Sequence, residues 1–106
     1  MGRIAVVAYL ITIGMFATAI AQESGDPKQG LEVAKQICSL CHAIQKGASP
    51  MADAPSFGEI AATPGMSPIA LNVAMRTSHK TMPPLVLAPD EHNDVIAYIL
   101  SLKAGN

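Results

Sequence analysis

Hydrophobic positions divide the chain into an apolar leader followed by short amphipathic segments. Residues 4–17 are apolar and uncharged, and the composition turns polar at Gln22. Beyond that point, apolar residues recur at helical spacing in three stretches, 27–37, 68–76 and 89–103. No stretch shows the convincing alternation of apolar and polar residues that is typical of a strand. The pattern therefore predicts a single compact domain with an all-α fold.

Prolines mark where the predicted helices begin. At the first two starts, a good helix-capping residue stands directly before a proline that suits the first helical position: Asp26 with Pro27, and Ser67 with Pro68. The third helix is predicted from Pro89 to Lys103, with acidic residues in its first turn, where the helix dipole favours them. Its expected buried stripe consists of Val95, Ile96, Ile99 and Leu102.

Two segments are predicted to be irregular. Residues 43–64 are rich in glycine and proline, which predicts a long loop with a single helical turn near 57–62. A loop of that length in a small domain usually wraps around something. The second segment contains Met82 followed by Pro83 and Pro84, and two adjacent prolines exclude regular helix. Met82 is therefore expected in an extended loop.

The leader has the features of a secretory signal peptide. A short positive start with Arg3 precedes the apolar run, and Ala19, Ile20 and Ala21 form a small-residue pattern that predicts cleavage after Ala21. We expect residues 1–21 to be a signal peptide and residues 22–106 to be one exported, periplasmic domain. The alternative is that 4–21 stay as a membrane anchor, since a span needs about 20 apolar residues.

The composition suggests that this domain has too few large apolar side chains to form a stable core by itself. Residues 22–106 contain a single tyrosine, Tyr98, and no tryptophan, at a size where a hydrophobic core alone gives marginal stability. Something other than side chains is therefore expected to fill the centre. The same segment has six basic and eight acidic residues, a formal charge of −2. This balance excludes a strongly basic patch and argues against nucleic-acid binding.

The candidate chemistry lies in the motif C-x-x-C-H formed by Cys38, Cys41 and His42. Two cysteines at this spacing alone fit a redox dithiol, half of a zinc site or a haem attachment site. A dithiol oxidoreductase would show a βαβ pattern, and zinc requires four ligands where the chain has no further cysteine. The histidine directly after the second thiol favours covalently attached haem, with the imidazole on one face of the iron.

The identity of the second axial ligand decides what such a haem can do. Candidates are Met51, Met66, Met75, Met82, His79 and His92. We favour Met82, which lies forty residues after His42 and can reach the opposite face of the haem. His79 is the alternative. The other methionines are expected to be packing or surface residues, and His92 is expected on the solvent side of the last helix.

These features together resemble the class I cytochromes c: a haem motif after an N-terminal helix, a late Met-Pro and a terminal helix reading DVIAYI. The resemblance implies three to five short helices around one covalently bound haem. In that family a glycine eight residues before the first cysteine packs on an aromatic residue of the last helix, which corresponds here to Gly30 and Tyr98. A proline carbonyl that accepts a hydrogen bond from the haem histidine corresponds to Pro55. The chain departs from the family at Ala34, often aromatic, and in having no tryptophan near a haem propionate.

The resemblance implies a single-electron carrier rather than an enzyme. With His42 and Met82 both on the iron, no position stays open for a small-molecule substrate. The expected partners are redox proteins, a dehydrogenase as donor and an oxidase or reductase as acceptor. Two alternatives stay open: a haem subunit bound permanently to one oxidoreductase, and a five-coordinate haem protein that binds gases or peroxide if Met82 is not a ligand.

Overall fold

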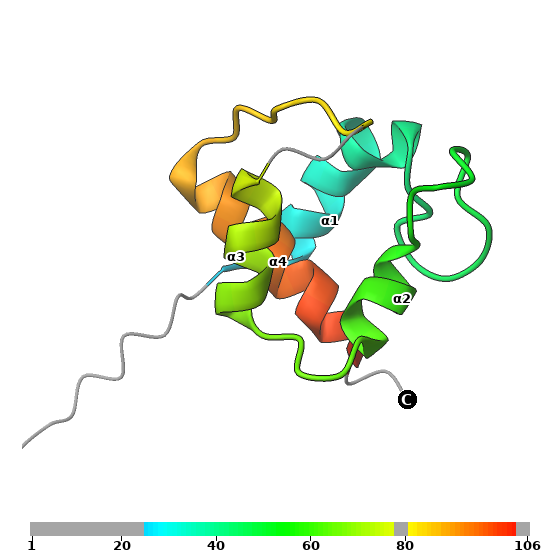
Figure 1. Cartoon of the computed structure of the whole chain (residues 1–106). Coiled ribbons are helices and arrows are strands. Elements are labelled where there is room, and N and C mark those ends of the chain that lie inside the picture. Colours follow the sequence, from blue (N-terminus) through cyan, green and yellow to red (C-terminus); the bar gives the residue numbers. More distant parts are fainter. Residues whose placement is uncertain (1–24, 78–80, 104–106) are drawn as a thin grey trace, which may run out of the picture.

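The computed structural model describes residues 25–77 and 81–103, and within these ranges all regular structure is helical (Figure 1). The elements in chain order are α1 (Pro27–Gln36), the short 3₁₀-helix η1 (Cys38–Leu40), α2 (Phe57–Ala62), α3 (Pro68–Arg76) and α4 (Pro89–Lys103). The predicted all-α class is confirmed. The signal peptide predicted at 1–21 and the alternative ligand His79 lie outside the described residues.

The helix starts follow the local signals in the sequence. The carboxylate of Asp26 accepts a hydrogen bond from the backbone N–H of Lys28, and the Ser67 hydroxyl accepts one from Ala70, which caps α1 and α3 ahead of their prolines. The short helix α2 has a full capping box, in which Ser56 and Glu59 each bond the other's backbone N–H. The three predicted helices and the single turn after Pro55 are therefore confirmed.

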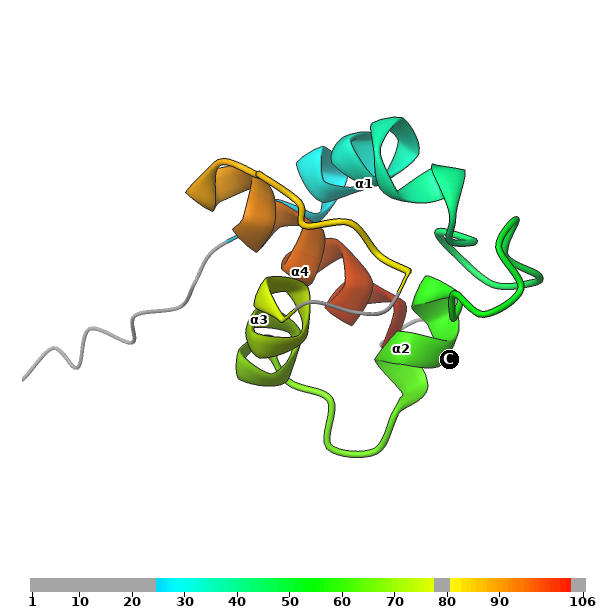
Figure 2. The ribbon, with the colours of Figure 1, turned by 45° about the horizontal axis from the view of Figure 1, so that its top comes forward.

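Helix α4 forms the centre of the domain. It packs against α1, α2 and α3, and Figure 2 shows it running between α1 and α3. The buried apolar core consists of Ala34, Phe57, Ala61, Leu71, Val95, Ile96, Tyr98 and Ile99. Half of these side chains belong to α4, so the predicted stripe on this helix is buried as expected, with Leu102 at its partly buried end. No helix within the described ranges is long and apolar enough to span a bilayer.

The crossing of α1 over α4 is close at Gly30. A Cβ atom on this residue would lie 1.9 Å from the carbonyl oxygen of Asp94 and 2.8 Å from the Cβ of Tyr98. Only glycine allows two helix backbones to approach so closely. The predicted contact between Gly30 and Tyr98 is confirmed. One turn later Ala34 is fully buried, so this small side chain also lets α1 lie close to the core.

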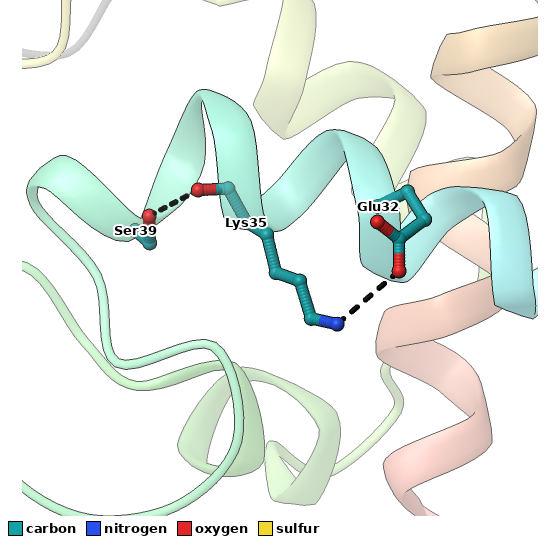
Figure 3. Close-up of polar contacts among 3 residues, drawn as sticks. All are labelled: Glu32, Lys35 and Ser39. Atoms are coloured by element: carbon teal, nitrogen blue, oxygen red, sulfur yellow. Dashed lines mark hydrogen bonds and ion pairs between the residues drawn. The ribbon is translucent and has the colours of Figure 1, made fainter.

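Side-chain contacts on the exposed side of α1 lead toward the cysteine motif, which follows directly after this helix. Lys35 forms an ion pair of 3.2 Å with Glu32, and the Ser39 hydroxyl donates a 2.6 Å hydrogen bond to the Lys35 carbonyl oxygen (Figure 3). An exposed ion pair of this kind adds little stability. The bond from Ser39 matters more, because it binds the end of α1 to the turn that presents the cysteines.

The prediction for His92 was wrong. It was expected to face solvent, but only 9% of the residue is exposed. It lies in the first turn of α4 and lines a cavity together with Met75 of α3 and residues of the loop 81–88. The loop and α3 cover a side of α4 that periodicity alone assigns to the surface.

Candidate functional site

The cysteine motif occupies one tight turn after α1, the segment 38–42, which we call the attachment turn. The carbonyl oxygen of Cys38 accepts hydrogen bonds from the backbone N–H groups of both Cys41 (3.1 Å) and His42 (2.9 Å). Two thiols and an imidazole are therefore held within a single turn. The cysteines are free thiols and partly exposed, and burial raises the pKa of the Cys38 thiol. Both sulfur atoms are available for attachment.

His42 is oriented by the loop that follows it. Its Nδ1 lies 2.7 Å from the carbonyl oxygen of Pro55. A carbonyl can only accept a hydrogen bond, so Nδ1 carries the proton and Nε2 keeps the lone pair that binds a metal. The hydrogen bond that the resemblance implied between these two residues is present. On another side the imidazole contacts the ring of Phe57, with centroids 5.4 Å apart at 49°, which further restricts the ring.

The long loop after the motif folds back on it. The backbone N–H of Met51 donates to the carbonyl of Cys41 (3.1 Å), and that of Phe57 donates to the carbonyl of Ala43 (2.9 Å). From the core, the hydroxyl of Tyr98 donates a 2.7 Å hydrogen bond to the carbonyl oxygen of Ile44. The predicted loop is thus held to the attachment turn and to the core by hydrogen bonds. Sequence reasoning missed the Tyr98 hydroxyl contact, because the family pattern asks only for an aromatic ring.

Met82 lies in the extended loop 81–88 between α3 and α4, as predicted, and is half-buried. It lines a cavity of about 420 Å³ with Met75, Leu85, Leu87 and His92 among the other lining residues. None of the lining residues belongs to the attachment turn. The structure therefore places Met82 at a partly open cleft that the attachment turn does not line.

A polar contact joins the loop that carries Pro55 to the loop that carries Met82. The Thr81 hydroxyl donates to a carboxylate oxygen of Asp53 across 3.3 Å. Thr81 directly precedes Met82, and Asp53 lies two residues before Pro55. Nothing in the local sequence signals this contact, which joins residues 28 positions apart.

The donor set fits a covalently attached haem. Two free thiols and an imidazole with an available Nε2 share one turn, and a thioether is presented from a separate loop. Among the residues that the structure describes, no group of three or more His, Cys, Asp and Glu side chains is gathered to hold a bare metal ion.

Comparison with known proteins agrees with this geometry. The chain is 35% identical over 88 residues to cytochrome c-552 of Bradyrhizobium diazoefficiens, and the match covers 82% of each chain. The chain belongs to the c-type cytochromes. No protein-family model and no solved structure matches it. The all-helical fold of this cytochrome agrees with the family, and family membership implies a covalently bound haem.

Proposed function

We propose that this cytochrome is a periplasmic single-electron carrier with one haem, attached through Cys38 and Cys41 and ligated by His42 and Met82. When bound, the haem supplies an iron centre that takes up and releases one electron at a time. The observation that carries the proposal is the 2.7 Å contact between Nδ1 of His42 and the Pro55 carbonyl. It fixes the imidazole in the tautomer that a metal ligand requires.

Each residue of the site has a separate task. The two cysteines fix the haem to the attachment turn. Pro55 orients His42 and makes Nε2 a stronger donor, because a carbonyl that accepts the Nδ1 proton raises the electron density of the ring. Met82, from the loop 81–88, would be the second protein ligand of the haem and would leave no position for small molecules. A thioether in this role would favour the reduced metal and so raise the reduction potential.

The setting of the protein follows from the leader. A signal peptide at 1–21 would export residues 22–106 as one domain to the periplasm. There the protein would collect electrons from a dehydrogenase and pass them to an oxidase or reductase. The name of its relative, cytochrome c-552, agrees with a role in electron transfer.

The first experiment is the absorption spectrum of the exported protein, recorded ferric and ferrous before and after acid–acetone extraction. We expect pigment that stays with the chain, a far-red ferric band of methionine ligation and no response to carbon monoxide. The variant Cys38→Ser/Cys41→Ser is the control and should lose its pigment on extraction. Retained haem without the far-red band, together with carbon monoxide binding, would instead support a five-coordinate haem protein.

A second candidate function is a haem subunit docked permanently on one oxidoreductase. It is favoured by apolar side chains exposed around the attachment turn: Leu40 is 77% exposed, and Ile37 and Met51 are 37% exposed each. Apolar surface of this kind is typical of protein contacts. Isolation of the native protein separates the two functions, because a free carrier elutes alone at its own mass and a subunit elutes with a larger flavin- or metal-containing chain.

A further inference from the structure

The segment 51–55 is fastened to the attachment turn at both ends. At one end, the backbone N–H of Met51 donates to the Cys41 carbonyl (3.1 Å), and at the other, the Pro55 carbonyl accepts from His42 (2.7 Å). Within the segment, the N–H of Ala54 donates to the Met51 carbonyl (3.0 Å), which closes a turn. Asp53 lies in this turn, so the position of its backbone is fixed relative to the cysteines and His42.

The Asp53 carboxylate reaches the loop that carries Met82. It accepts a hydrogen bond from the hydroxyl of Thr81 at 3.3 Å. Thr81 directly precedes Met82, and Pro83 and Pro84 follow, so the backbone around Met82 has few alternative conformations. A contact at Thr81 is therefore transmitted to the position of Met82 more directly than it would be through flexible residues.

We propose that Asp53 and Thr81 form a tether that holds Met82 in its ligand position and slows its replacement by other ligands. The inference rests on the proposed ligation by Met82. Asp53 and Thr81 are positioning residues: neither has a nitrogen or sulfur atom suited to the iron, and both act through Met82. The tether restricts the movement of two loops relative to each other. One loop contains Pro55, the hydrogen-bond partner of His42, and the other contains Met82.

The expected effect is modest, and its size follows from the geometry. Both side chains are exposed, and 3.3 Å is long for a hydrogen bond between oxygen atoms, which is usually 2.5–3.0 Å. A bond at the weak end of the normal range changes an equilibrium by about two- to five-fold. This change is measurable at the sixth coordination position, where exogenous imidazole binds only after Met82 has left. The apparent affinity for imidazole therefore rises with the population of the open form.

The test is a titration of the ferric, haem-containing protein with imidazole, in which loss of the far-red absorption band is the signal. Thr81→Val and Asp53→Ala should each raise the apparent imidazole affinity about two- to five-fold. The double variant should show no more than the larger single effect, because each change breaks the same bond. Thr81→Ser and Asp53→Asn keep a donor and an acceptor and should stay close to wild type. Thr63→Val is the matched control, since it removes an exposed hydroxyl bonded only within its own segment, to the Glu59 carbonyl.

Each other outcome overturns a defined part of the inference. Wild-type affinity in both Thr81→Val and Asp53→Ala, with the far-red band intact, overturns the tether and leaves Met82 ligation standing. Multiplied effects in the double variant overturn it too, because the residues then act independently. An Asp53→Asn variant that behaves like Asp53→Ala would assign the effect to charge instead of the bond. A wild-type protein without the far-red band overturns Met82 ligation and the tether with it.

Discussion

The hydroxyl of Tyr98 donates a 2.7 Å hydrogen bond to the carbonyl oxygen of Ile44, two residues beyond His42. Tyr98 is only 6% exposed, and its Cβ lies against Gly30 at the crossing of α1 and α4. Its ring also lies beside that of Phe57, with centroids 6.3 Å apart. One residue of α4 therefore joins the helix crossing to the loop that begins directly after the attachment turn.

Replacing the hydroxyl should weaken the whole domain. Tyr98→Phe keeps the ring but leaves the partly buried Ile44 carbonyl without its donor, and we expect a loss of about 1–2 kcal/mol in the free energy of unfolding. Denaturant unfolding of the haem-containing protein measures this loss. Tyr98→Leu, which also removes the ring, should cost about 3 kcal/mol or more. Equal stability of Tyr98→Phe and wild type would mean that water replaces the hydroxyl without cost.

The same residue predicts how stability depends on pH. Burial raises the pKa of the Tyr98 phenol, and the smaller effects of a hydrogen bond with Gln45 and the charge of Lys35 lower it. The folded state then holds this proton more tightly than the unfolded state. The stabilisation is complete below the ordinary tyrosine pKa of about 10 and is lost as pH rises through the raised folded value. The stability difference between wild type and Tyr98→Phe, measured by denaturant unfolding from pH 7 to 11, should shrink above about pH 10. A difference that stays constant over this range would contradict the prediction.

The close helix crossing gives a third prediction. Gly30→Ala places a methyl group within 2 Å of the Asp94 backbone carbonyl, so α1 must move away from α4. Overpacking of this kind costs about 1–3 kcal/mol, and a clash with backbone belongs at the upper end. Gln29→Ala, at the exposed neighbouring position of the same helix, should be near neutral. Thermal unfolding of both variants and wild type measures these effects. Equal melting temperatures of Gly30→Ala and wild type would show that the helix crossing adjusts without cost.

The helices could be predicted because their start signals are local. A capping side chain bonds an N–H two or three residues ahead, so Asp26 and Ser67 predict the starts of α1 and α3 without any knowledge of the fold. The burial of His92 could not be predicted in the same way. Helical periodicity describes α4 alone, whereas the cover over His92 comes from α3 and the loop 81–88.

The site shows the same division. The attachment turn could be read from its motif, and the contact of His42 with Pro55 followed from the resemblance to class I cytochromes c. The hydrogen bonds from Tyr98 to Ile44 and from Thr81 to Asp53 join residues 54 and 28 positions apart. No periodicity or spacing rule links residues at such separations, so these contacts emerge only in the folded chain. Ligation by Met82 stays a prediction.

Replacing Met82 tests that ligation directly. Met82→His exchanges a thioether, which favours reduced iron, for an imidazole, which does not, so the midpoint potential should fall. A fall on the order of 0.1 V or more is expected within the span of about 0.8 V that axial ligands produce. The far-red band should vanish while carbon monoxide still fails to bind, because the iron keeps six ligands.

The matched control for this change is Met75→Leu. Met75 lines the same cavity as Met82 and is also partly buried, and leucine nearly conserves its volume. A redox titration of this variant should give the wild-type potential with the far-red band intact. If Met82→His leaves the potential unchanged, Met82 is not on the iron. If Met75→Leu instead removes the band, the thioether ligand comes from α3 and the loop 81–88 only covers it.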